Sequence, residues 1–186
     1  MSRQLAKHWI TADEYERMGE AGIFGAGTRL ELIEGEIYKM PPIGSSHAAC
    51  VDFLVLTLNE LSQRRFIVRA QNPIRLSDFS EPQPDIALLR WRDDFYRQRH
   101  PTPADVLLVV EVAGTTVGTD RAVKVPLYAA AGIPETWIVN LPDEQIEVYA
   151  EPADGTYQIV KHYRRGERAQ SHTVADLAVS VAEVLG

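Results

Sequence analysis

Apolar positions along the chain follow helical spacing in some segments and strand spacing in others. One set recurs at intervals of three and four residues and so shares one face of a helix: Val51, Leu54, Leu58 and Leu61. This spacing predicts a helix over about residues 45–63, with Ser45 or Ser46 as its cap. The predicted helix therefore has one apolar face.

Three further helices are predicted from capping and turn residues. Thr11 and Glu14 have the spacing of a capping box, which predicts a helix over about residues 12–20. A second helix is expected within residues 120–131, where Pro126 requires it either to begin near Lys124 or to bend. A short helix near residues 179–185 closes the chain.

Strand patterns fill most of the remaining chain. The run DVLLVVEV at residues 105–112 is almost continuously apolar, which is typical of a central strand buried on both faces. Two segments around Glu34 and Gly35 form a predicted hairpin, 29–33 with 36–40. The other predicted strands are 66–70, 73–76 (separate from 66–70 or continuing it as one bent strand), 84–89, 135–140, 145–149 and 157–163.

The order of these elements predicts an α/β (α+β) fold with a mixed sheet flanked by helices, preceded by an N-terminal helix and a β-hairpin. No repeat, linker or low-complexity segment divides the chain. We therefore expect one domain over residues 1–186, with its core at about residues 25–150. Residues 151–186 are predicted to add a strand and a helix to this core.

Composition narrows the function classes. The net charge of −7 over 186 residues argues against a protein that coats nucleic acid non-specifically. The one cysteine excludes an internal disulfide framework and a cysteine-rich zinc site. No apolar run is long enough to cross a membrane and the N-terminus does not resemble a secretory signal, so we expect a cytoplasmic protein with no membrane partner.

Two acidic residues stand next to apolar strand segments, where a lone charge is costly. Asp85 begins one predicted strand and Glu111 lies near the end of the central one. If these strands are neighbours, the two carboxylates lie together, and a divalent cation such as Mg²⁺ or Mn²⁺ would relieve their repulsion. Lys124, near the start of the crossover helix, could orient a water molecule or stabilise a phosphoryl group there. Equally, strand-end acids can cap a loop or pair with an arginine, and spacing alone leaves both interpretations open.

At these residues the sequence resembles the PD-(D/E)XK nuclease superfamily, and more closely its Uma2-like branch, also called DUF820. The resemblance covers roughly residues 10–150 and depends on an ordered combination of motifs rather than on any one of them. The matching pieces are ELIEGEI at 31–37, His47 after a proline-containing loop, PQPD at 82–85, VVEV at 109–112, Asp120 with Lys124 and Tyr128, and GIPETWIV at 132–139.

The resemblance implies a restriction-endonuclease-like core and Mg²⁺-dependent (or Mn²⁺-dependent) cleavage of phosphodiester bonds. It assigns Asp85, Glu111 and the carbonyl of Val112 as metal ligands. The superfamily pattern places its lysine two residues after the glutamate, where this chain has Ala113. In the Uma2-like branch that lysine is found on the helix, which fits Lys124. Gly114 stands where the branch commonly has an aspartate.

Two more candidate site residues are carried over by position. Glu31 could approach the metal or bind its water, or it could be an exposed charge on the hairpin. His47 begins a helix and could accept a proton or contact a phosphate, or it could be only a polar residue at a helix start. Tyr128 and Trp137 are expected in the core, and the other four histidines at the surface.

The expected partner is nucleic acid, with DNA as the expected polymer, and a homodimer would suit a nuclease that cuts two strands. Residues 62–101 carry eight arginines and five acidic residues, a local net charge of +3. Within them Arg92, Arg97 and Arg99 alternate with aromatic side chains, an arrangement that can bind phosphates or form an ordinary solvated surface. Two other functions remain open: a nuclease fold without activity that acts as a binding or regulatory module, and a glycosidase carboxylate pair, which leaves Lys124 unexplained.

Overall fold

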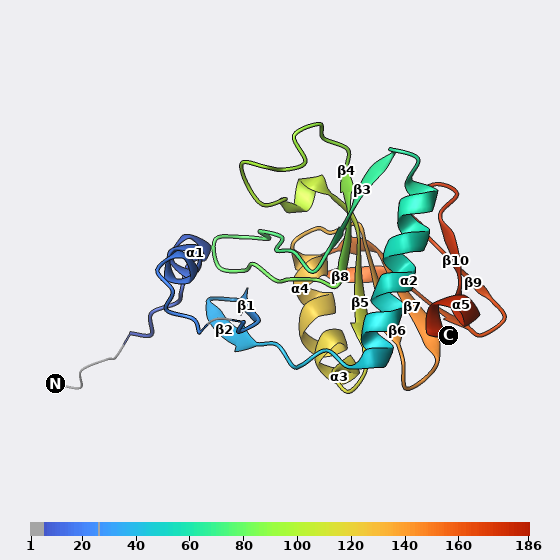
Figure 1. Cartoon of the computed structure of the whole chain (residues 1–186), viewed down its shortest axis with the longest axis horizontal. Helices are drawn as coiled ribbons and strands as arrows, with labels where there is room; N and C mark the ends of the chain where they lie inside the picture. The colour runs from blue at the N-terminus through green and yellow to red at the C-terminus, as the bar shows by residue number, and fades with distance from the viewer. Residues whose placement is uncertain (1–5, 26) are drawn as a thin grey trace.

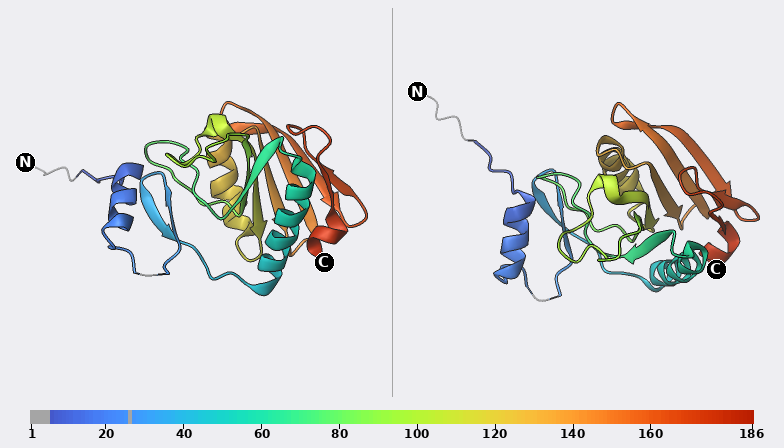
Figure 2. Two further views of the ribbon diagram at one scale, coloured as in Figure 1. Left: turned by 45° about the horizontal axis from the view of Figure 1, so that its top comes forward. Right: turned by 90° about the horizontal axis from the view of Figure 1, so that it is seen from above.

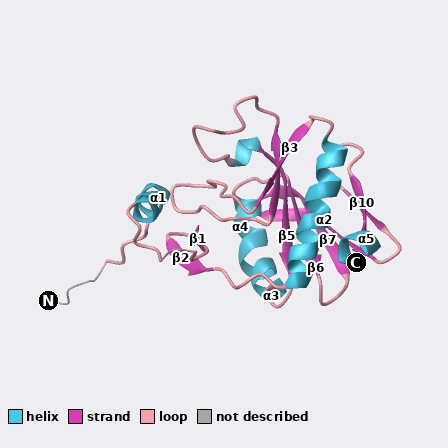
Figure 3. Cartoon of the chain, in the orientation of Figure 1, coloured by secondary structure: helices cyan, strands magenta, loops and turns pink. Residues whose placement is uncertain are grey.

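A six-stranded mixed sheet forms the centre of the computed structural model, which describes residues 6–25 and 27–186. The strand order is β3-β4-β5-β6-β7-β8, and only β5 and β6 are parallel neighbours. The strands are β3 (Phe66–Ala70), β4 (Ile86–Arg90), β5 (Val106–Ala113), β6 (Glu135–Asn140), β7 (Gln145–Ala153) and β8 (Thr156–Arg164). The fold is the predicted mixed α/β architecture (Figure 3).

Helices cover both faces of this sheet (Figure 2). The amphipathic helix α2 (Ser45–Ser62) packs its apolar side against β3, β4 and β5, together with the C-terminal helix α5 (Val181–Leu185). Helix α4 (Val125–Ala130) lies on the opposite face, where its Tyr128 joins a second apolar cluster. The strand β5 contributes to both clusters and is almost wholly buried, as its apolar run predicts.

The crossover from β5 to β6 is not a regular α-helix. It begins earlier than predicted, with α3 (Val117–Thr119), and continues as a π-helical segment η2 (Asp120–Lys124) before α4. Pro126 lies in the first turn of α4, where its missing N–H is tolerated. Of the two alternatives, a helix that begins near Lys124 describes α4 better, but the π-helical segment η2 leads directly into it.

The N-terminal residues form a small unit of their own beside the sheet (Figure 1). It consists of α1 (Ala12–Glu20), which has the predicted capping box, and the antiparallel hairpin of β1 (Leu30–Ile33) and β2 (Glu36–Lys39). A separate apolar cluster around Ala12, Tyr15 and Leu32 holds it together. Backbone hydrogen bonds attach the hairpin to the segment 79–81: Glu81 N–H donates to the Leu32 carbonyl (2.7 Å) and Gly35 N–H to that of Phe79 (2.7 Å).

Some expectations for individual elements were wrong. The segment 73–76 is not a strand, because the N–H groups of Ile74 and Leu76 bond the carbonyls of Pro82 and Ser80 within the same loop. Gly44, not a serine, precedes α2, and no side chain caps that helix. The sequence pattern also missed three short elements: the 3₁₀ helix η1 (Pro103–Asp105) and the pair of β9 (Arg168–Gln170) with β10 (Ala178–Ser180), which precedes α5.

The described residues contain no helix long and apolar enough to cross a membrane.

Candidate active site

A cavity of about 800 Å³ lies where the hairpin, the start of α2, the ends of β4 and β5, and the segment α3–η2 meet. The titratable side chains that line it include four acids and two potential cations: Glu31, Asp85, Glu111, Asp120, His47 and Lys124. All five side chains named by sequence as catalytic candidates are among them. The fold therefore gathers residues from positions 31 to 124 around one space.

The sheet register brings Asp85 and Glu111 together. Strands β4 and β5 are antiparallel neighbours with Ile86 paired to Val110, so Asp85 and Glu111 stand opposite one another one step further along. The backbone N–H of Val112 donates to Asp85 Oδ2 at 2.9 Å. The expectation that the two strands are neighbours is thus confirmed.

Hydrogen bonds hold Asp85 in its ionised form. Burial alone would raise the pKa of this carboxyl group, but His47 and the Val112 N–H lower it below its ordinary value. His47 Nε2 lies 2.9 Å from Asp85 Oδ2, while the other oxygen has only a 3.4 Å contact from Gln71 Nε2. Asp85 Oδ1 is therefore the oxygen better placed to take a new partner.

Glu111 is fully enclosed on the α4 side of the sheet. Burial raises its pKa to about 8, although Lys124 acts in the opposite direction. Its Oε1 accepts hydrogen bonds from Tyr128 Oη at 2.6 Å and from Lys124 Nζ at 3.3 Å. Tyr128 is in the core as expected, yet its hydroxyl group belongs to the site. An apolar run interrupted by one glutamate could have indicated that a buried donor must lie nearby.

Lys124 joins the hairpin to the sheet. Its ammonium group lies 3.2 Å from Glu31 and 3.3 Å from Glu111, and all three side chains are buried. Burial would lower the pKa of Lys124, but the carboxylates of Glu111, Glu31 and Asp120 outweigh it and raise that pKa. Of the two interpretations of Glu31, an exposed charge on the hairpin is therefore wrong, because the side chain is buried.

Two cavity residues received no role from the sequence. Asp120 is buried four residues before Lys124, and burial raises its pKa. Asp120 was one of the residues that carry the resemblance to the Uma2-like branch, and its position there could have indicated that it belongs to the site. Arg29 lies just before β1, and its buried Nη2 has no hydrogen-bond partner within residues 6–25 and 27–186. An unpaired guanidinium nitrogen in an acidic cavity suits an anionic ligand.

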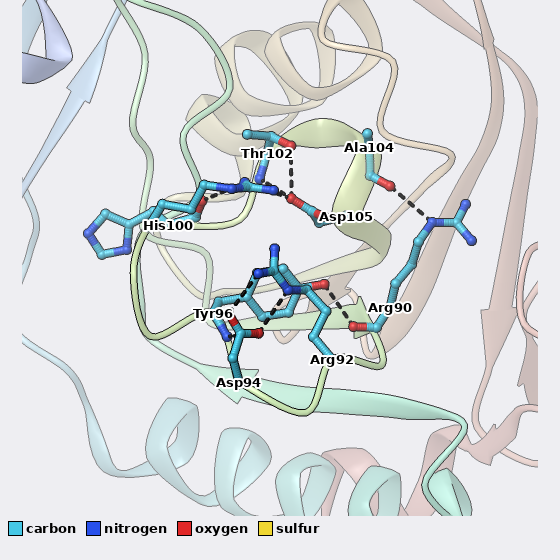
Figure 4. Close-up of polar contacts among 9 residues, drawn as sticks. Arg90, Arg92, Asp94, Tyr96, His100, Thr102, Ala104 and Asp105 are labelled. Carbon is cyan, nitrogen blue, oxygen red and sulfur yellow. Dashed lines mark hydrogen bonds and ion pairs between the residues drawn. The ribbon is translucent and has the colours of Figure 1, made fainter.

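The arginine-rich loop after β4 is held by its own carboxylates and lies outside the cavity lining (Figure 4). Arg92 pairs with Asp94 at 2.7 Å and stacks on Tyr96, and Arg99 pairs with Asp105 at 3.0 Å. Arg97 is exposed. A role of Arg92, Arg97 and Arg99 in binding nucleic acid stays a prediction.

Gly114 leaves open space beside the cavity. A Cβ built at this position would meet no atom of the described chain within 4 Å. No neighbouring side chain of the described residues therefore fills the space beside Gly114. Asp85 and Glu111 keep their hydrogen bonds from Val112 N–H and Tyr128 Oη without an aspartate at this position.

Replacing Tyr128 with Phe should weaken both the fold and the ionisation of Glu111. The change removes the 2.6 Å hydrogen bond to Glu111 Oε1 and adds no volume, so we expect a loss of about 1.5–3 kcal/mol in the free energy of unfolding. Urea denaturation measures it, with Tyr163→Phe on β8 as the control, because no hydrogen bond to the Tyr163 hydroxyl occurs within the described chain. Equal stability of both variants would show that the Tyr128 hydroxyl does not support Glu111.

Comparison with known proteins gives three results. The family model described as "Uma2: Putative restriction endonuclease" matches residues 12–182. The fold matches the crystal structure of "a putative nuclease belonging to DUF820" from Anabaena variabilis with a TM-score of 0.74, at 17% identity, over 95% of this chain and 97% of that one. No curated protein matches this sequence. Because the family model covers nearly the whole chain and the fold agrees with it, the protein belongs to the Uma2 family.

Proposed function

We propose that the protein is a metal-dependent endonuclease that hydrolyses phosphodiester bonds in nucleic acid. The observation that carries this proposal is the meeting of Asp85, Glu111 and Lys124 in one cavity at the ends of adjacent strands. The description of the family as "Putative restriction endonuclease" supports the reaction class. Such restriction-endonuclease-like proteins generally use divalent metal ions.

The cavity suits Mg²⁺ or Mn²⁺. Its donors are carboxylate oxygens, the ligand type that these hard cations prefer, and the described lining contains no cysteine. Asp85 and Glu111, with the Val112 carbonyl, are the groups that would hold the ion, and Asp120 is a further carboxylate in the lining of the same cavity. A bound divalent ion supplies Lewis-acid polarisation of a phosphoryl oxygen and activation of a water molecule.

The surrounding side chains have distinct tasks in this proposal. Lys124 offers a buried ammonium group that can donate to a water molecule or to a developing phosphoryl charge. Glu31 fixes that ammonium group from the hairpin side and Tyr128 fixes Glu111 from α4. His47 orients Asp85 through Nε2, and its buried Nδ1, which has no partner among the described residues, is left to exchange a proton or contact a phosphate.

DNA is the proposed substrate, and Arg29 is the phosphate ligand proposed on the cavity wall, because its buried Nη2 has no hydrogen-bond partner among the described residues. Its guanidinium group can donate to the oxygens of a phosphate. The phosphate would otherwise be repelled by the carboxylates of the cavity, so its binding would also need the proposed metal ion and Lys124. A homodimer would provide two such sites, one for each strand of a duplex, and is therefore the proposed assembly.

A cleavage assay tests the proposal directly. Supercoiled and single-stranded DNA, and RNA, are incubated with the purified protein in Mg²⁺, Mn²⁺ or EDTA. We expect cleavage with either metal, none in EDTA, and none by Glu111→Gln. Glu60→Gln on the exposed side of α2 is the matched control and should cut like the wild type.

If the wild type cuts no nucleic acid but calorimetry shows that it binds Mn²⁺ through Asp85, the chain is instead a binding module with an intact metal site. Cleavage that survives Glu111→Gln would contradict the proposed site.

A further inference from the structure

A second group of potential metal ligands lies outside the lining of the catalytic cavity. It comprises Glu16 on α1, Glu81 in the loop before β4, and His100 in the loop before η1. Figure 4 shows the imidazole of His100 pointing away from the contacts of the arginine-rich loop. These three residues are 65 and 19 positions apart in sequence, so only the fold brings them together.

The three ligand atoms are close enough to share an ion. One oxygen of each carboxylate and one ring nitrogen of His100 all lie within 4.8 Å of one another. Ligands of a tetrahedral ion with bonds of 2.0–2.2 Å are about 3.4 Å apart, so modest side-chain rotations would close the site. Glu16 and His100 are partly exposed, which gives an ion and one or more water ligands a route to Glu81.

One oxygen of Glu81 lacks the partner that a buried carboxyl group requires. The residue is only 2% exposed, and its Oε2 has no hydrogen-bond partner among the residues described. Burial raises the pKa of Glu81 to about 8, and Glu16 adds to this rise through its charge and through a hydrogen bond between the two carboxyl groups. Such orphaned buried groups are rare in folded proteins and call for an explanation, an unseen ion among them.

Nearby arginines do not supply this partner. Arg75 is close enough to act on Glu81 through its charge, yet its guanidinium group is bound to Asp13 at 2.6 Å and lies 3.6 Å from Asp78. Burial lowers the pKa of His100, and the charges of Arg69 and Arg75 act in the same direction. No ion pair within the described residues includes Glu16, Glu81 or His100. Within the described residues, two carboxyl groups and an imidazole thus face one another, and no lysine or arginine forms an ion pair with any of them.

We propose that Glu16, Glu81 and His100 form a second metal site, which binds a divalent transition-metal ion of the Zn²⁺ class. An imidazole ligand favours Zn²⁺ and similar late transition-metal ions over Mg²⁺ and Mn²⁺, which prefer oxygen ligands. The site is chemically distinct from the all-oxygen donor set of the catalytic cavity. It does not depend on the proposed nuclease activity.

The position of this site gives the ion a structural task. It would link α1 to the loop before β4 and to the loop before η1, adding metal bonds to the backbone contacts that attach the N-terminal unit. The same unit carries Glu31, which contacts Lys124 in the catalytic cavity. Metal bound at Glu81 would therefore stabilise the position of a cavity wall without touching the cavity.

The experiment separates the two sites by disabling the catalytic one. The full chain carrying Asp85→Asn with Glu111→Gln serves as the parent, and it is titrated with Zn²⁺ by calorimetry and with Co²⁺ by visible absorption. We expect saturable binding near one ion per chain and a rise in the thermal midpoint. Adding His100→Gln or Glu81→Gln should weaken that binding at least about tenfold, since each removes a ligand.

His162→Gln is the matched control, because this histidine is exposed on β8 and belongs to neither site. It should bind Zn²⁺ like the parent. His100 is partly exposed, so its variant keeps the test valid if Glu81→Gln fails to fold. Absence of saturable binding by the parent, or binding that His100→Gln leaves unchanged, would overturn the proposal. Neither result bears on DNA cleavage, which the parent lacks by design.

Discussion

Asp85→Asn should remove metal-dependent cleavage almost completely while the protein remains folded. Asparagine keeps the side-chain oxygen that accepts from Val112 N–H, so the contact between the loop before β4 and strand β5 survives. It removes the negative charge that the proposed ion requires. We expect a fall of at least about 10³-fold in the rate under saturating Mg²⁺, which corresponds to about 4 kcal/mol of transition-state stabilisation.

Three measurements check this prediction together: cleavage of plasmid DNA, binding of Mn²⁺ by calorimetry, and circular dichroism. Asp52→Asn, an exposed aspartate on α2, is the control and should change none of them. Normal cleavage by Asp85→Asn would remove this residue from the mechanism. Lost cleavage with unchanged Mn²⁺ affinity would show that it acts on the substrate rather than on the metal.

Lys124→Met should cost about 3–5 kcal/mol in the free energy of unfolding and also abolish cleavage. The ammonium group lies within 3.3 Å of both Glu31 and Glu111, and methionine fills the same space without a charge. Removing one member of a buried ionic cluster leaves its partners uncompensated, which is more costly than removing the whole cluster. Added Mn²⁺ should restore more stability to this variant than to the wild type, because the ion replaces the missing positive charge.

A second substitution distinguishes charge imbalance from lost packing. Glu31→Gln in the Lys124→Met background removes one of the unpaired carboxylates and should recover part of the stability, but no cleavage. Lys161→Met, at an exposed position on β8, is the control and should leave the denaturation midpoint almost unchanged. If Lys124→Met is as stable as the wild type, the ion pairs of Lys124 do not contribute to the fold.

The strongest local patterns predicted the central fold. The apolar run of β5, the capping box of α1 and the hairpin turn at Glu34 and Gly35 each specify an element through neighbouring residues alone. Segment 73–76 failed because four residues with a proline do not reveal where their N–H groups will bond. The pair β9–β10 was missed for a similar reason: three-residue strands carry too little periodicity.

The residues of the candidate site likewise fall into two groups: those that a local sequence pattern indicates, and those that only the folded chain brings together. Asp85 and Glu111 could be found because each interrupts an apolar strand pattern, and the register then places them opposite one another. The contact between Glu31 and Lys124 joins residues 93 positions apart and follows from how the hairpin docks, which no local pattern encodes. His100 was expected at the surface, but it is partly buried and faces Glu16 and Glu81. That environment is created by one helix and two loops that meet only in the folded chain.

Docking of the hairpin also has a consequence for hydrogen exchange. The N-terminal unit has its own small apolar cluster and a limited number of bonds to the segment 79–81, whereas the sheet is held by two large clusters. The unit should therefore open at a lower free energy than the sheet, as a separate cooperative segment. Amide protons of β1 and β2 would then exchange together and before those of β5. Each opening would take Glu31 away from Lys124, so the fraction of molecules with a complete site would equal the fraction with this unit closed.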